Sequence, residues 1–101
     1  ISMKFKVEKH HSVISEIQQL THEQQETLNL DYKKIEEDGI EFVYVKSLGK
    51  KLFEIKTNEI RSLFKYAEGK IIVVGVVFVK KTQKTPSEKI KLAQKRLKGI
   101  K

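Results

Sequence analysis

The chain has 101 residues, of which 34% are charged, and a formal net charge of +8 at pH 7. This length suits one domain, residues 1–101, with a hydrophobic core of its own. The absence of Cys excludes disulfides and thiolate metal sites, and the longest apolar run, residues 71–79, is far shorter than the roughly 20 residues of a membrane-spanning helix.

The chain begins with the pattern of a short strand followed by a helix. Residues 3–9 alternate apolar and polar side chains, which is typical of a half-buried or edge strand. We expect Ile1 and Ser2, which precede Met3, to be a cloning remnant. Ser12 can cap a helix that turns several apolar side chains to one face. These side chains are Val13, Ile14, Ile17 and Leu20.

A second helix follows directly. Thr21 and Gln24 have the spacing of a capping box, in which each side chain bonds the backbone of the other, and Gly39 stops the helix. The acidic last turn, residues 36–38, opposes the helix dipole and therefore favours a contact with a loop or a partner. The apolar stripe of this helix consists of Leu28, Tyr32 and Ile35.

After the second helix the apolar residues recur with the period of strands. Residues 40–45 are expected to form a short extended segment, and residues 52–56 and 60–67 to form two strands. Glu68 and Gly69 then predict a tight hairpin.

Residues 70–79 contain almost no polar side chain, so we expect a central strand covered on both faces. Gly75 within it indicates a bulge or a close backbone approach. A last helix should start with Thr85 as N-cap, Pro86 at its first position and Glu88 in its first turn. Its inward side chains are Ile90, Ala93 and Leu97, and its outward ones are Lys89, Lys91, Lys95, Arg96 and Lys98. The elements predict an α+β fold: two N-terminal helices on a small, mainly antiparallel sheet, with a C-terminal helix.

The charge is distributed unevenly along the chain. Residues 1–40 carry five Lys or Arg and eight Asp or Glu, whereas residues 41–101 carry 16 and five. A basic half favours a polyanionic partner, such as RNA, DNA, an acidic membrane surface or an acidic protein. A lysine-rich surface that only keeps the protein in solution is the plain alternative, and the asymmetry favours a binding face.

Residues 48–56, "LGKKLFEIK", and 78–86, "FVKKTQKTP", with Arg61 between them, resemble the phage-derived HigB-like toxins of the RelE superfamily. The resemblance extends over residues 3–101 in the order of elements. It implies a small cytoplasmic toxin of a type II toxin–antitoxin system that cuts mRNA, usually on the ribosome, without metal or other cofactor. It also implies a cognate antitoxin, often of the helix-turn-helix type, through which the complex can bind operator DNA. No membrane partner is implied.

Two positions depart from the family pattern. Lys56 stands where many relatives carry Arg, and Val76 and Val77 stand near the place, ahead of the Phe, where many carry His or Asn. A polar group that helps proton transfer is therefore missing at Val76. This makes a non-catalytic RNA- or ribosome-binding module the alternative function, and a domain that binds an acidic protein is a third.

Cleavage of RNA by its own 2′-hydroxyl needs a base, an acid and positive charge on the phosphate. Strand alternation places Glu54 and Lys56 on one sheet face together with Arg61 and Lys65. We expect Arg61 to bind the phosphate. Glu54 is either the base or the ion-pair partner of Arg61 or Lys56.

Lysines where the last strand meets the last helix complete the predicted site. Lys80 and Lys81 point to opposite sides of a regular strand, and Lys84 precedes a helix whose N-terminal amides can also hold a phosphate. The predicted catalytic residues are Arg61, Lys80, Lys81, Lys84 and Glu54. The predicted RNA-binding residues are Lys50, Lys51, Lys56 and Lys65.

The histidines and tyrosines have weaker patterns. His10, His11 and His22 lie at helix entrances in the acidic half, and their spacing predicts no metal site. Tyr44 and Tyr66 can stack on a base, but packing in the core or at a sheet edge is the favoured role for each.

Overall fold

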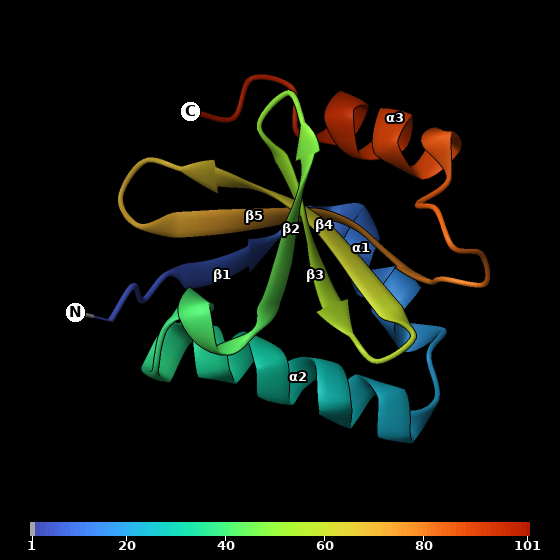
Figure 1. Cartoon of the computed structure of the whole chain (residues 1–101), viewed down its shortest axis with the longest axis horizontal. Helices are drawn as coiled ribbons and strands as arrows, with labels where there is room; N and C mark the ends of the chain where they lie inside the picture. The colour runs from blue at the N-terminus through green and yellow to red at the C-terminus, as the bar shows by residue number, and fades with distance from the viewer. Residues whose placement is uncertain (1) are drawn as a thin grey trace.

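The computed structural model describes residues 2–101, which form a five-stranded sheet with helices on both faces (Figure 1). The elements are β1 (Lys6–Lys9), α1 (His11–Gln18), α2 (His22–Glu37), the 3-10 helix η1 (Ile40–Phe42), β2 (Tyr44–Gly49), β3 (Leu52–Thr57), β4 (Ile60–Ala67), β5 (Ile71–Val79) and α3 (Ser87–Arg96). The strand order is β1-β5-β4-β3-β2. Neighbours from β2 to β5 are antiparallel, whereas β1 is parallel to β5. The predicted α+β class is confirmed, and the parallel β1 makes the sheet mixed.

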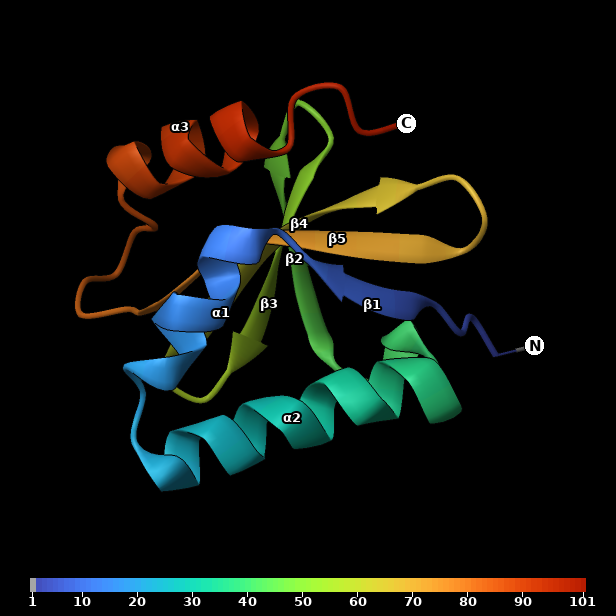
Figure 2. The same cartoon turned by 180° about the vertical axis from the view of Figure 1, so that it is seen from behind.

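The sheet separates two apolar clusters. Helices α1 and α2 cover one face (Figure 2), and α3 covers part of the other. On the first face, the helical side chains that pack on the strands include Val13, Leu28, Tyr32 and Ile35. On the second face, Ala93 and Leu97 pack on Leu52, Leu63, Val76 and Phe78. The predicted central position of β5, covered on both faces, is therefore confirmed. No helix within residues 2–101 is long and apolar enough to cross a membrane.

The two N-terminal helices begin differently from one another. The capping box of α2 is present, because the Thr21 hydroxyl accepts from Gln24 N–H at 3.1 Å and Gln24 Oε1 accepts from Thr21 N–H at 3.0 Å. For α1 the prediction was wrong: the N-cap is His10, whose Nδ1 accepts from the backbone N–H of Ser12. Ile14 is also 53% exposed. Helix α1 turns Val13 toward the sheet, and Ile14 lies about 100° further round the helix, so its side chain points away from the core.

The acidic end of α2 contacts the first strand. Glu36 Oε2 accepts from the backbone N–H of Val7 at 2.8 Å, so the contact is with a strand and not with the expected loop or partner. Residues 40–42 then form η1 rather than an extended segment, because the chain turns at Gly39 to bury Ile40, whose N–H donates to the Met3 carbonyl at 2.8 Å.

Strand β5 contains a bulge at Gly75. Leu63 of β4 pairs with Val76, and the next residue of β4 pairs with Val74, so Gly75 has no partner of its own. A Cβ at Gly75 would lie 2.7 Å from Leu97 Cγ, so both expected features, bulge and close approach, are present. The extra residue reverses the alternation: Val74 faces α1 and α2, as does Val77 beyond the bulge.

The bulge also explains why the predicted orientation of Arg96 was wrong. Arg96 was expected on the outer face of α3, but its Nη1 donates to the Gly75 carbonyl at 2.9 Å and to Glu16 Oε2 at 2.8 Å. Glu16 Oε1 in turn accepts from Val77 N–H at 3.0 Å. Strand β1 pairs with β5 only as far as Val74. The side chains of Arg96 and Glu16 therefore bond the Gly75 carbonyl and the Val77 N–H, which lie beyond the end of that pairing.

Replacing Gly75 with Ala should destabilise the domain by about 1–3 kcal/mol, because the new methyl group overlaps Leu97. Urea unfolding of Gly75→Ala, Leu97→Ala and the double variant measures this. The cost of Gly75→Ala should shrink sharply in the Leu97→Ala background. An equal cost in both backgrounds would contradict the proposed contact.

Candidate nucleic-acid interface

The sheet face opposite α1 and α2 carries a row of four side chains from four strands. Tyr44 of β2 lies opposite Lys56 of β3, which lies opposite Arg61 of β4. Arg61 lies opposite Phe78 of β5. Directly opposed residues project to the same face, so these four form one line, called here the Arg61 row. Helix α3 covers its Phe78 end, where Lys89 Nζ lies 5.5 Å from the ring centroid.

Arg61 is held in place by backbone carbonyls and by a carboxylate. Its Nη1 donates to the carbonyls of Asn58 at 2.5 Å and Ile60 at 3.0 Å. Its Nε lies 3.8 Å from Glu54 Oε1 and is buried without a hydrogen-bond partner among residues 2–101. Glu54 therefore takes the ion-pair role, one of the two expected for it. The Arg61 side chain is 9% exposed, so its guanidinium sits at a fixed place just below the surface.

The other oxygen of Glu54 anchors the segment that leads into α3. Glu54 Oε2 accepts a hydrogen bond from the Thr85 hydroxyl. The prediction that Thr85 caps α3 was therefore wrong: the N-cap is Pro86, and the helix begins at Ser87 without a side-chain cap. A buried carboxylate loses more from a missing donor than exposed helix amides lose from a missing acceptor, because water can serve the amides.

Residues 80–86, called here the junction, carry three of the predicted catalytic lysines; they form the orange loop before α3 in Figure 1. The backbone N–H of Lys80 donates to the Glu59 carbonyl at 2.8 Å, so the chain leaves the sheet beside the start of β4. The Lys80 side chain is half-buried, whereas Lys81 and Lys84 are exposed. The Thr85 anchor then returns the junction to the same end of the sheet.

The other predicted lysines fall into two groups. Lys56 is exposed within the Arg61 row. Lys50, Lys51 and Lys65 instead line a hollow near the C-terminal residues, at the other end of the sheet. Lys50 and Lys51 form the two-residue β2–β3 turn, with φ of 53° and 63°. The structure thus brings Lys56, the Arg61–Glu54 pair and the junction together, and leaves these three lysines apart.

The two tyrosines differ in their surroundings. Tyr66 packs as expected, with its ring centroid 5.0 Å from that of Phe53 and 5.3 Å from that of Phe64. The same expectation was wrong for Tyr44, which is 79% exposed. It begins β2, an edge strand, so no further strand covers it. The alternation of apolar and polar residues shows which face a side chain occupies but not which strand lies at the edge of the sheet. The exposure of Tyr44 in the Arg61 row could therefore not be predicted from it.

The histidines lie with the helices of the opposite face. The rings of His10 and His11 are 4.2 Å apart at the start of α1. Burial, and next the neighbouring His11, lowers the pKa of His10. Among the described residues, no three His, Cys, Asp or Glu side chains are grouped so that they could hold a metal ion.

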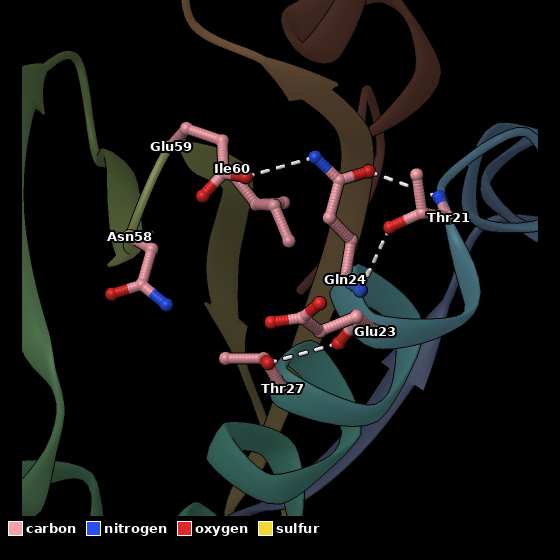
Figure 3. Close-up of a pocket in the computed structure, with 7 residues that line it drawn as sticks. All are labelled: Thr21, Glu23, Gln24, Thr27, Asn58, Glu59 and Ile60. Atoms are coloured by element: carbon pink, nitrogen blue, oxygen red, sulfur yellow. Dashed lines mark hydrogen bonds between the residues drawn. The ribbon is translucent and has the colours of Figure 1, made fainter.

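A polar pocket between the start of α2 and the β3–β4 turn is unsuited to a phosphate (Figure 3). Its charged lining residues, Glu23 and Glu59, are both acidic. Gln24 Nε2 donates to Glu59 Oε2 at 2.9 Å, and this bond is the main cause that lowers the pKa of Glu59. The Gln24–Glu59 hydrogen bond therefore ties the β3–β4 turn to α2, next to the carbonyls of Asn58 and Ile60 that hold Arg61.

Comparisons with known proteins give two findings. The family model described as "Phage derived protein Gp49-like (DUF891)" matches residues 15–98. The crystal structure of the archaeal RelE–RelB complex from Pyrococcus horikoshii contains a similar chain, with a TM-score of 0.55 and 15% sequence identity, over 78% of this chain and 98% of that one. No curated protein matches the chain in sequence. At this identity the structural likeness establishes a RelE-like fold.

Changing Thr85 to Val should cost about 1–3 kcal/mol of stability, because it leaves a buried oxygen of Glu54 without its donor. Thr82→Val is the matched control, since the Thr82 hydroxyl bonds only the exposed Lys84 carbonyl. Urea unfolding compares the two. If both variants lose the same stability, the anchoring role of Glu54 is wrong.

Proposed function

Because the chain belongs to the phage-derived Gp49-like family, we propose that it is the toxin of a type II toxin–antitoxin system, a HigB-like member of the RelE superfamily. It inhibits translation as an endoribonuclease that cuts mRNA on the ribosome without a metal. The observation that carries this proposal is the meeting of Lys56, Arg61 and the lysine-bearing junction at one end of an open sheet face. The RelE-like fold and the basic second half of the chain support it.

In the proposed reaction the 2′-oxygen attacks the adjacent phosphorus and loses its proton to a base. The bond from phosphorus to the 5′-oxygen breaks, and an acid protonates that oxygen. Negative charge builds on the phosphate in between, so fixed positive groups accelerate the step. Lys56 is exposed and contacts the phosphate directly, while Arg61, held by two carbonyls, adds a positive field from just beneath.

The proton transfers are assigned to the junction. Glu54 is 3% exposed and both of its oxygens are engaged, by Arg61 and by Thr85, so it positions these groups rather than accepting the proton. Lys80, Lys81 and Lys84 are the groups we assign, because the junction leaves the sheet beside the start of β4, next to Arg61. Two of them have exposed side chains.

The partners follow from the same surface. A cognate antitoxin, of the helix-turn-helix type, holds the toxin inactive by laying an acidic segment over the Arg61 row and the junction, and carries the complex to operator DNA. The similar solved structure is itself a complex of RelE with RelB, which supports such a partner. The toxin acts in the cytoplasm, where mRNA and ribosomes meet.

A non-catalytic RNA- or ribosome-binding module is the second candidate. The observation that favours it concerns the two positions at which a proton-transfer group was expected. Glu54 is engaged, and Val76, where many relatives carry a polar residue, is fully buried beneath α3. Such a module stalls translation and leaves mRNA intact.

Primer extension on mRNA from a cell-free translation reaction tests the proposal. The chain should produce new 5′ ends, and Lys80→Ala/Lys81→Ala/Lys84→Ala should abolish them. The matched control, Lys4→Ala/Lys6→Ala/Lys33→Ala, removes the same charge from exposed positions away from the Arg61 row and the junction and should keep cutting. Intact mRNA with the unaltered chain, while translation stops, would favour the second candidate.

Arg61→Ala should slow cutting by a factor corresponding to about 2–4 kcal/mol in the transition state, the usual effect of one charge-stabilising group. The rate of appearance of cut mRNA measures this loss. Circular dichroism of the variant serves as the control for folding. Cutting at the unaltered rate by the folded variant would remove Arg61 from the site.

A further inference from the structure

We propose that Tyr44 and the cavity beside it form a subsite for one unpaired base of single-stranded RNA, next to the phosphate bound by Lys56 and Arg61. This subsite rests on the proposed function, because it assigns the base that accompanies the phosphate in the same site.

Tyr44 is an exposed aromatic side chain on the edge strand of the sheet. Its side chain is 79% exposed, and Phe42, 60% exposed, lies two residues before it. Burying large aromatic side chains is strongly favourable, so two exposed rings at one place indicate a ligand surface. Stacking on an aromatic ring is the means by which proteins hold unpaired bases, since every base has a flat face.

A cavity beside Tyr44 has a lining that suits a base. Tyr44 and Phe42 line a hollow of about 220 Å³ at the edge of the sheet, between β2, the β3–β4 turn and α2, and Lys56 of the Arg61 row lines it as well. Polar groups that can bond a base edge line the same hollow, among them Asn58 and Thr27. Its acid, Asp31, accepts from the Thr57 hydroxyl at 2.6 Å and lies 3.8 Å from Lys34 Nζ, so it is already paired and repels an anionic strand little.

The distance along the Arg61 row suits one nucleotide. Tyr44, Lys56 and Arg61 lie on three adjacent strands, so Tyr44 and Arg61 are about two strand spacings apart, roughly 10 Å. A nucleotide that places its phosphate at Lys56 can therefore place its base over Tyr44. Lys46, also exposed and two residues along β2, shares the same face and can hold the next phosphate.

The lining charges favour RNA over a peptide. The charged residues of the hollow are Asp31, Lys34 and Lys56, and the acid is paired. An apolar peptide strand added to β2 would use Tyr44 without needing the lysines. Because Lys34 is paired with Asp31, an unpaired nucleotide uses the ring and Lys56, which accounts for their juxtaposition.

A direct test uses fluorescence, because the chain contains no Trp. In Tyr44→Trp the single indole reports on the subsite, and a stacked base should quench its emission when a short single-stranded RNA is added. Ile14→Trp, at an exposed position on α1, which covers the opposite face of the sheet, is the control and should not respond. Quenching of Ile14→Trp to the same extent would overturn the proposal.

Affinity separates the base from the backbone. Tyr44→Ala should weaken binding of the RNA between about 5- and 150-fold, the range for loss of one base–aromatic stack, while Tyr44→Phe stays close to the unaltered chain. An oligonucleotide with the same ribose–phosphate chain but no bases should bind Tyr44→Ala and the unaltered chain equally. Equal affinity of Tyr44→Ala and the unaltered chain for the normal RNA would overturn the subsite.

The outcomes also separate this subsite from the nuclease proposal. If Tyr44→Ala loses RNA affinity but the unaltered chain cuts no mRNA, the subsite stands and the nuclease function falls. If mRNA is cut and Tyr44→Ala binds normally, the nuclease stands and the subsite falls. If the unaltered chain binds no single-stranded RNA at moderate salt, the RNA-binding face is wrong, and the subsite is overturned with it.

Discussion

The bulge at Gly75 is the constraint on which the arrangement of this domain depends. One extra residue in β5 reverses the alternation of the side chains that follow it. As a result, apolar side chains on either side of the bulge are buried on both faces of the sheet. The missing side chain lets Leu97 approach the strand, and the Arg96–Glu16 pair completes the hydrogen bonds of the bulged edge. A local irregularity of the backbone thereby fixes α1 and α3 against the same strand.

This packing determines where the basic groups can act. Because α3 is fixed at the Phe78 end of the Arg61 row, the Tyr44 end stays open to solvent. Glu54 then joins the sheet to the junction: it neutralises part of the charge of Arg61 with one oxygen and holds Thr85 with the other. A buried carboxylate in a basic site therefore gives rigidity to the groups around it, which is what stabilisation of a developing charge requires.

Local features of the sequence were sufficient for much of the fold. The Thr21–Gln24 capping box depends on residues three apart, and the facing of the strands follows from their alternation, so both could be predicted. The errors come from partners distant in sequence. Arg96 faces inward because of Glu16, and Thr85 leaves its helix because of Glu54. Tyr44 is exposed because β2 lies at the edge, and strand order is set by the whole sheet.

The central claim is that the Arg61 row and the junction promote attack by the 2′-hydroxyl of a bound mRNA. The most direct test is mass spectrometry of the RNA ends formed when the chain is added to translating ribosomes. The account predicts a 2′,3′-cyclic phosphate, or the phosphate left by its hydrolysis, and a 5′-hydroxyl on the other fragment. Fragments that carry a 3′-hydroxyl and a 5′-phosphate would contradict it, because they would mean that water rather than the 2′-oxygen attacks the phosphorus.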